Sequence, residues 1–256
     1  MSTITKEPLT RLKAAAIHLA LSLLLVSVVC GVMLFMWYPP PLFAVLGGYG
    51  LLLIIAGVDI VLGPLLTFIV FRSGKWGMKF DLFCIGACQC AALVYGLYTI
   101  AEVRPTFIVF VKDRFELVRT LDIPASQFAE AKNVAFNAPS WFGPKTIGVK
   151  FPTDPAEQFA LMDSSLAGGA DIHMLPKYFA SIEPSLPAIK KSAKSLDALK
   201  KLNPDKVAEI DKLPQKWNLA PADVGFVVMR AIRADIAMIV NKQTGEILGM
   251  EKFTPW

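Results

Sequence analysis

The chain has 256 residues, a mean hydropathy of +0.51 and a hydrophobic content of 54%, which is too apolar for one ordinary soluble domain. Its charges are spread unevenly, because the first hundred residues hold six Lys or Arg and three carboxylates, whereas the remainder holds 20 and 18. This second part is nearly neutral and, at about 150 residues, long enough to bury its own core. Composition therefore excludes a single soluble domain and predicts a membrane module followed by a soluble domain.

Three apolar segments reach the transmembrane length of roughly 20 residues. They cover about residues 14–38, 48–71 and 80–100, so we expect a cytoplasmic N-terminus at 1–13, a transmembrane module at 14–100 and an exported domain at 101–256. The first segment is too long for the apolar region of a cleaved signal peptide. Val29 stands where a lipoprotein signal has a small residue before its cysteine, which argues against lipidation of Cys30.

The connections between the segments predict their orientation. Arg72, Lys75 and Lys79 crowd the second connection, and Lys and Arg resist translocation. The first connection carries no charge, and we expect its aromatic residues at the membrane interface: Trp37, Tyr38 and Phe43. This pattern predicts a multi-pass protein with a cytoplasmic N-terminus and residues 101–256 outside, which in a Gram-negative bacterium is the periplasmic side of the inner membrane.

An aspartate, Asp59, lies near the middle of the second apolar segment, where a carboxylate costs roughly 2.5 to 3.5 kcal/mol. At helical spacing it shares one face with small and polar residues, namely Ala56, Gly63 and Thr67. Pro64 has no N–H, so the Ile60 carbonyl loses its helical donor. Two interpretations remain open: Asp59 is satisfied inside the three-helix bundle, or this face receives a polar group from a partner's helix.

Two further polar residues lie near the cytoplasmic ends of the segments. His18 and Asp81 could form a pair, or they could be an interfacial histidine and a carboxylate at a helix N-terminus. All four cysteines fall within the apolar segments, so the exported domain has no disulfide. We interpret Cys84, Cys88 and Cys90 as small packing residues rather than a redox or metal site.

Residues 101–256 predict an α+β domain with a mostly antiparallel sheet. Alternating patterns predict strands at Thr106–Val111 and in segments that begin at Phe115, Thr146, Gly225, Asp235 and Glu246, with a hairpin turn at KQTG from Lys242. Helices are expected from Ala125 and from Asp154, whose side chain is a plausible cap. The lysine-rich stretch 185–212 predicts two short helices separated at Asn203-Pro204.

The exported domain contains no pattern typical of catalysis. It has one histidine, His173, no cysteine, no phosphate-binding glycine loop and no nucleophile elbow. The stretch 185–212 lacks interleaved aromatics and carries carboxylates among its lysines, which favours a solvated face over a nucleic-acid surface. We therefore expect no enzymatic activity, cofactor, metal or nucleic-acid partner.

Several stretches resemble the TfpX/TfpZ family of type IV pilin accessory proteins, and the resemblance covers nearly the whole chain. They are KAAAIHLALSLLL, FMWYPPPLF, GVDIVLGPLLTFIVF, KFDL, LYTIAEVRP, DRFELV, LAGGADIHMLPKYF, KQTGEILG and the terminal FTPW. The resemblance implies a chaperone-like inner-membrane accessory factor that binds membrane-held pilin and promotes pilus assembly. It also implies that the partner is a type IV pilin, whose apolar N-terminal helix carries a glutamate and a free amine.

The residues and the resemblance together give a docking hypothesis. The face of Ala56, Asp59, Gly63, Pro64 and Thr67 would bind the pilin helix in the lipid bilayer, and the exported domain would contact the pilin head. A membrane-anchored ligand sensor is the alternative, although the cytoplasmic segments are too short for an output domain. A membrane thiol oxidoreductase would require the three cysteines of the third segment.

Overall fold

The computed structural model describes residues 10–256, which form two compact units. The helical unit comprises the chain up to Phe35 together with Gly48–Ala101, and the sheet unit comprises Met36–Gly47 together with Glu102–Trp256. Most of the expected cytoplasmic N-terminus, residues 1–9, lies outside the described residues. Because Met36–Gly47 belongs to the sheet unit, the chain passes between the units three times.

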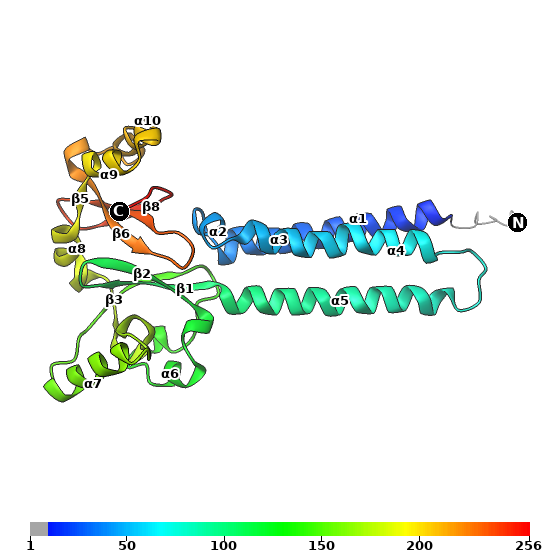
Figure 1. Ribbon diagram of the computed structural model, residues 1–256, viewed down its shortest axis with the longest axis horizontal. Coiled ribbons are helices and arrows are strands. Elements are labelled where there is room, and N and C mark those ends of the chain that lie inside the picture. Colours follow the sequence, from blue (N-terminus) through cyan, green and yellow to red (C-terminus); the bar gives the residue numbers. More distant parts are fainter. Residues whose placement is uncertain (1–9) are drawn as a thin grey trace, which may run out of the picture. The chain divides into compact units, whose positions relative to one another are not determined.

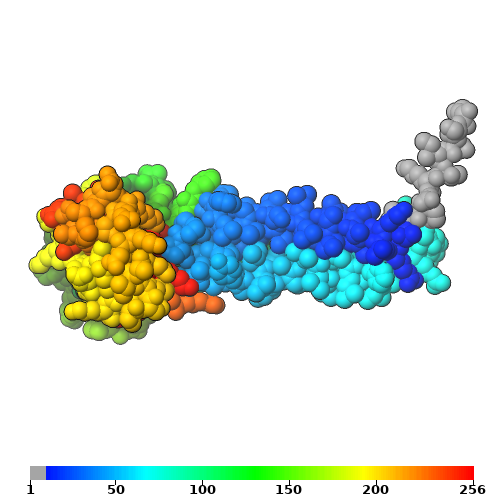
Figure 2. Space-filling view, turned by 90° about the horizontal axis from the view of Figure 1, so that it is seen from above, coloured from blue at the N-terminus to red at the C-terminus, as the bar shows by residue number. Residues whose placement is uncertain are grey.

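Three helices of the described chain are long and apolar enough to cross a membrane, which confirms the three predicted apolar helices. The first is α1 (Arg11–Gly31), which continues as the π-helix η1 (Val32–Trp37). The second runs through α3 (Gly48–Ala56), the π-helix η2 (Gly57–Leu62) and α4 (Gly63–Val70), and the third is α5 (Met78–Val103). Figure 2 shows α1 and α4, in blue and cyan, lying along one another.

Two of these helical segments, α1 and α4, begin where the sequence provides a cap or a proline. The hydroxyl of Thr10 accepts a hydrogen bond of 3.2 Å from the Lys13 amide at the start of α1. Pro64 lies in the first turn of α4, where its missing N–H removes no helical bond within that segment. The second span is therefore three joined segments rather than one regular helix.

A mixed sheet of eight strands organises the sheet unit (Figure 1). Its path runs β4-β3-β1-β2-β6-β7-β8, and β5 pairs with β6. The strands are β1 (Pro105–Val111), β2 (Arg114–Arg119), β3 (Lys145–Val149), β4 (Phe179–Ala180), β5 (Lys194–Ser195), β6 (Val224–Arg230), β7 (Ile236–Asn241) and β8 (Ile247–Glu251).

Most strand pairs are antiparallel, as expected, but two parallel pairs make the sheet a mixed one. β1 pairs with β3 in parallel and β2 pairs with β6 in parallel, whereas the other pairs are antiparallel. Parallel neighbours need a crossover of a dozen or more residues, and the long connections from β2 to β3 and from β4 to β6 supply it. The two-residue strands β4 and β5 were not predicted, because they are too short to show alternation.

Helices cover the sheet on both faces. The α-helices of the unit are α2 (Leu42–Val45), α6 (Ala125–Ala129), α7 (Pro155–Leu166), α8 (Leu186–Ser192), α9 (Leu196–Leu202), α10 (Val207–Ile210) and α11 (Leu213–Lys216). Short 3-10 helices lie at Thr120–Asp122, Val134–Phe136, Ile172–Met174, Pro176–Tyr178, Glu183–Ser185, Pro204–Lys206 and Pro221–Asp223. Asp154 caps α7 as expected, accepting from the Ala156 amide at 3.2 Å.

The segment between the first two membrane helices is part of the core of the sheet unit. Leu42 and Val45 of α2 are fully or almost fully buried against Ile108, Phe115 and Met238, on the sheet face that α8 also covers. The other face packs against α6 at one end and against α9 to α11 at the other. The three aromatic residues that we expected at the membrane interface, Trp37, Tyr38 and Phe43, are all buried within the protein.

Candidate functional site

The candidate site in the helical unit is centred on the π-helix η2. The N–H of Gly63 donates to the carbonyl of Val58, five residues back, which widens the helix by one residue just before Pro64. π-bulges of this kind occur often at functional sites. The structure buries Asp59, Gly63, Pro64 and Thr67 within the helical unit, so this predicted face points away from the surface.

Gln89 of α5 is the nearest hydrogen-bonding partner of Asp59. Its Nε2 lies 3.5 Å from Asp59 Oδ1, at the long limit of a hydrogen bond, and its Oε1 is buried with no hydrogen-bond partner among the described residues. A Cβ on Gly63 would collide with the same amide, so a larger residue at position 63 would force the Gln89 side chain to move away from Asp59. Sequence reasoning missed Gln89, although a lone amide in an apolar helix was the available signal.

A second pair of polar residues links α1 to α4. His18 Nδ1 and Thr67 Oγ1 are 2.6 Å apart, so His18 contacts the predicted face, and of the two alternatives for His18 and Asp81 the structure does not show the pair. Asp81 forms an ion pair of 2.6 Å with Lys75 in the preceding loop. The structure thus places the partly buried His18 and Gln89 beside the buried Thr67 and Asp59 of the helical unit and leaves Asp81 apart.

Ala56 lies outside this polar interior. It is partly exposed and lines an apolar groove of about 380 Å³ between α1 and α3, together with Leu23, Val26, Ser27, Cys30, Tyr49, Leu52, Leu53 and Ile60. On α5, Cys84, Cys88 and Cys90 are exposed on the helix surface, and all four cysteines are free. No cluster of three metal-binding side chains occurs among residues 10–256.

The sheet unit has a cleft of about 630 Å³ beside α7. Glu116 and Arg230 are register partners on β2 and β6, and their side chains approach to 3.5 Å in this cleft. Burial raises the pKa of the Glu116 carboxyl above its usual value, although Arg230 opposes the shift. His173 lines the same cleft, 3.8 Å from Asp171, and burial lowers the pKa of its imidazole.

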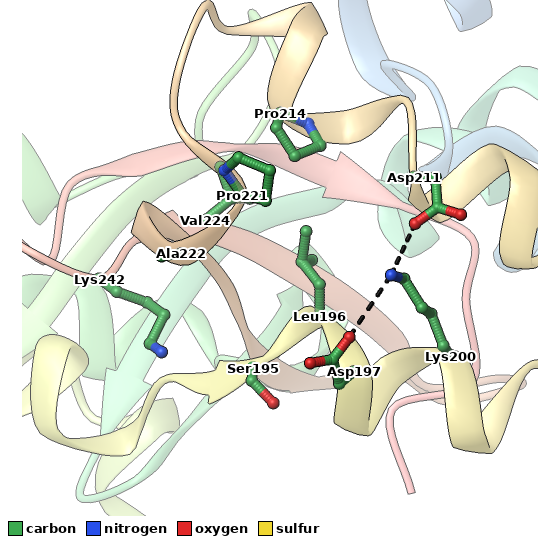
Figure 3. Close-up of a pocket in the computed structure, with 10 residues that line it drawn as sticks. All are labelled: Ser195, Leu196, Asp197, Lys200, Asp211, Pro214, Pro221, Ala222, Val224 and Lys242. Carbon is green, nitrogen blue, oxygen red and sulfur yellow. Dashed lines mark hydrogen bonds and ion pairs between the residues drawn. The ribbon is translucent and has the colours of Figure 1, made fainter.

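The lysine-rich helices form a smaller pocket of about 380 Å³, shown in Figure 3. Lys200 of α9 bridges Asp211 at 2.6 Å and Asp197 at 3.4 Å, while Lys242 lies on the opposite side in this view. Ser195 caps α9 by accepting from the Ala198 amide. Two of the carboxylates that interrupt the lysines in the sequence, Asp197 and Asp211, are therefore ion-pair partners of Lys200.

The fold and the site define a class of protein with three candidate membrane helices, a buried polar cluster between them and a mixed-sheet α/β domain. A model of the family "Fimbrial assembly protein FimB" matches residues 7–47. A relative from Dichelobacter nodosus, "Fimbrial assembly protein, serogroups C1 and C2", is 34% identical over 121 residues, which are 46% of this chain and 92% of the relative. The chain belongs to the family of fimbrial assembly proteins.

Two longer relatives from the same organism extend the similarity over most of the chain. "Fimbrial assembly protein, serogroup I" is 29% identical over 231 residues, or 89% of both chains. "Fimbrial assembly protein, serogroup E1" is 28% identical over the same length and the same share of each chain. No solved structure matches the chain.

Proposed function

We propose that this chain is a chaperone-like accessory factor of the TfpX/TfpZ type, which binds pilin subunits held in the bacterial inner membrane and promotes their assembly into a type IV pilus. It acts by binding, without catalysis. Membership in the fimbrial assembly family supports a role in assembling fimbriae. The names of the relatives refer to fimbrial assembly and do not specify a binding partner, so the pilin is our inference.

The observation that carries the proposal is the surplus of hydrogen-bond acceptors beside η2. The Asp59 carboxylate receives one long amide contact, and the buried Oε1 of Gln89 has no partner in the described chain. Buried acceptors without donors are costly in a membrane. A protonated amine at the start of an apolar helix would supply several N–H donors to both oxygens and would balance the carboxylate charge.

The third helix leaves room for such a partner. Among its 26 residues, only Ile100 of α5 is buried. It contacts the second span through close approaches at two glycines, Gly63 against Gln89 and Gly96 against Ile55 at 3.4 Å. A pilin helix can therefore pack against α5 without displacing a large interface within this chain. In that position it would lie close to the acceptors of Asp59 and Gln89.

The sheet unit supports the proposed topology. Leu42 and Val45 are buried in the core that residues 102–256 build, so the first connection and the C-terminal domain must lie on the same side of a membrane. Two candidate spans separate them, which satisfies this requirement. We place this side in the periplasm, since Arg72, Lys75 and Lys79 favour a cytoplasmic position for the second connection.

Photo-crosslinking in native membranes tests the proposal. A photoreactive residue replaces Gly86, which has open space around its Cα and is one turn from Gln89 on α5. We expect it to capture pilin through the pilin N-terminal helix, and the same residue at Cys84, on the far side of the helix, to capture much less. Mass spectrometry of the crosslinked peptides identifies the partner.

The polar contact is tested in the same assay. Asp59→Asn should lower pilin capture from position 86 several-fold, because it removes the charge that pairs with the amine. Asp81→Asn is the matched control, since Asp81 pairs with Lys75 outside the polar interior. Equal capture in the two variants would contradict the role of Asp59, and absence of pilin at every position would contradict the proposed function.

A further inference from the structure

A short loop in the sheet unit exposes two large aromatic side chains. In this aromatic loop, Ser140–Gly143, the Trp141 side chain is 56% exposed and Phe142 is 82% exposed. Other aromatic residues nearby in sequence and space, such as Phe136 and Phe107, are buried in the core. The exposed pair is therefore not part of the hydrophobic core of the unit.

The aromatic loop is held in place by polar contacts at its base. The buried Arg104 donates from Nε to the Ser140 carbonyl at 3.1 Å, and its guanidinium carbon lies 4.2 Å from the centre of the Trp141 ring. The Ser140 amide donates to Thr106 Oγ1 at 2.7 Å. A cation over an aromatic ring and two buried hydrogen bonds fix the direction of the loop before any ligand binds.

The same contacts place the loop beside two ends of the candidate membrane spans. Trp37 is the last residue of the first span, and its ring centroid is 6.2 Å from that of Trp141. Arg104 directly follows Val103, the last residue of the third span. Gly143 adopts a positive φ of 73°, and a Cβ there would lie 3.7 Å from the Met36 carbonyl.

A residue in contact with the ends of two membrane helices lies at the level where those helices leave the bilayer. Tryptophan is enriched at this level, because its ring is apolar and its N–H can bind water or headgroups. Phenylalanine one residue further on adds apolar area without a polar group. A soluble surface would gain nothing from exposing both side chains, whereas the interface of a bilayer buries them.

We propose that the aromatic loop is a membrane-interface anchor, with Trp141 and Phe142 inserted into the outer boundary of the lipid bilayer. The anchor holds the sheet unit at the bilayer surface through a contact additional to the three chain connections to the helical unit. It needs no pilin, so its test is independent of the proposed partner.

Spin labels measure the insertion directly. A chain with its four cysteines replaced by serine receives a single labelled cysteine at Phe142, and is reconstituted in vesicles of phosphatidylethanolamine and phosphatidylglycerol. Collision rates with oxygen, which concentrates in the bilayer, and with a water-soluble nickel complex then report the depth of the label. Leu166 is the matched control, because it is 80% exposed and ends α7, away from the start of β1 in Figure 1.

We expect the oxygen-to-nickel collision ratio to be several-fold higher at position 142 than at position 166. The same chain can be kept soluble without lipid or detergent in an amphipathic polymer. The difference in collision ratio between positions 142 and 166 should then be smaller, because no lipid interface is present. Equal ratios at the two positions in vesicles would overturn the proposal. A label at 142 that is shielded from both reagents would also overturn it, since that pattern indicates a protein contact rather than lipid.

Discussion

The helical unit and the sheet unit differ in how much of their apolar surface is buried within the chain. The central strands of the sheet unit are buried on both faces, with six of the seven residues of β1 and the first five of β7 buried. In the helical unit, α5 buries Ile100 alone. The sheet unit therefore closes a complete core within one chain, whereas the helical unit leaves most of its apolar surface for lipid or for another helix.

Polar groups follow the same division. In the sheet unit, Arg104, Ser140 and Thr106 are buried and joined by hydrogen bonds of 2.7 to 3.1 Å. In the helical unit, Gln89 reaches Asp59 only at 3.5 Å, and its Oε1 stays without a partner among residues 10–256. A rigid polar network specifies one structure, whereas an incompletely satisfied one is suited to exchange for the groups of a partner. The variants below test this division.

The largest effect is expected in the core of the sheet unit. Leu42→Ala removes a fully buried side chain from the face covered by α2, and we expect a loss of about 2 to 5 kcal/mol in the free energy of unfolding. Pulse proteolysis of the full chain in detergent measures it. Leu121→Ala is the control, since Leu121 is 44% exposed and its loss should cost about 0.5 kcal/mol or less. Equal effects would mean that residues 36–47 are not part of this core.

A smaller effect is expected at the contact between the second and third candidate spans. Gly63→Leu would push Gln89 away from the second span, at a cost of about 1 to 3 kcal/mol for overpacking. Crosslinking between cysteines at positions 55 and 96, in a chain without other cysteines, should fall several-fold. Gly57→Leu, at the start of the adjoining π-helix η2 and with nothing within 4 Å of a Cβ, should leave the crosslinking unchanged. The same loss in both variants would show that the glycine contact does not hold α5.

The smallest effect is a pH dependence in the cleft of the sheet unit. Burial lowers the pKa of folded His173 below its ordinary value of 6.5, so the unfolded chain binds the proton first as the pH falls. The free energy of unfolding therefore decreases as the pH falls through the ordinary pKa of histidine, and it stops decreasing below the pKa of His173 in the folded protein. His173→Gln should lose less stability between about pH 7 and pH 5. Urea unfolding at a series of pH values measures the free energy of unfolding of both proteins. If this free energy changed with pH in the same way in the two proteins, the prediction would be contradicted. Any contribution from His18 is the same in both, because both chains contain it.

The sequence predicted some levels of this structure better than others. Sequence patterns placed β1, β2, β3, β6, β7 and β8, because strand-forming residues between turn residues are a local signal, although β1 and β7 are buried without the expected alternation. The parallel pairing of β1 with β3 was not predicted, since register between distant strands depends on the whole chain. The same reason explains the connection at 36–47: aromatic residues beside an apolar segment are typical of a membrane interface, and only the packing of Leu42 shows a core.

The candidate site was predicted in part. Asp59, Gly63 and Thr67 could be grouped by helical spacing, and the structure does bring them into one buried interior. Their partners on other helices, His18 and Gln89, could not be assigned, because spacing within one helix carries no information about which helix faces it. The docking role of this face stays a prediction for the crosslinking experiment.

The burial of α2 has a consequence for how the protein is made. Residues 36–47 are synthesised before any strand of the sheet. Leu42 and Val45 therefore stay unpacked until the strands that cover them have been synthesised. If the second or third helix failed to insert, this segment and the later strands would be separated by the bilayer, and the sheet unit could not close. If the three candidate helices span a membrane as proposed, a closed sheet unit would therefore indicate that they had inserted in the proposed orientation.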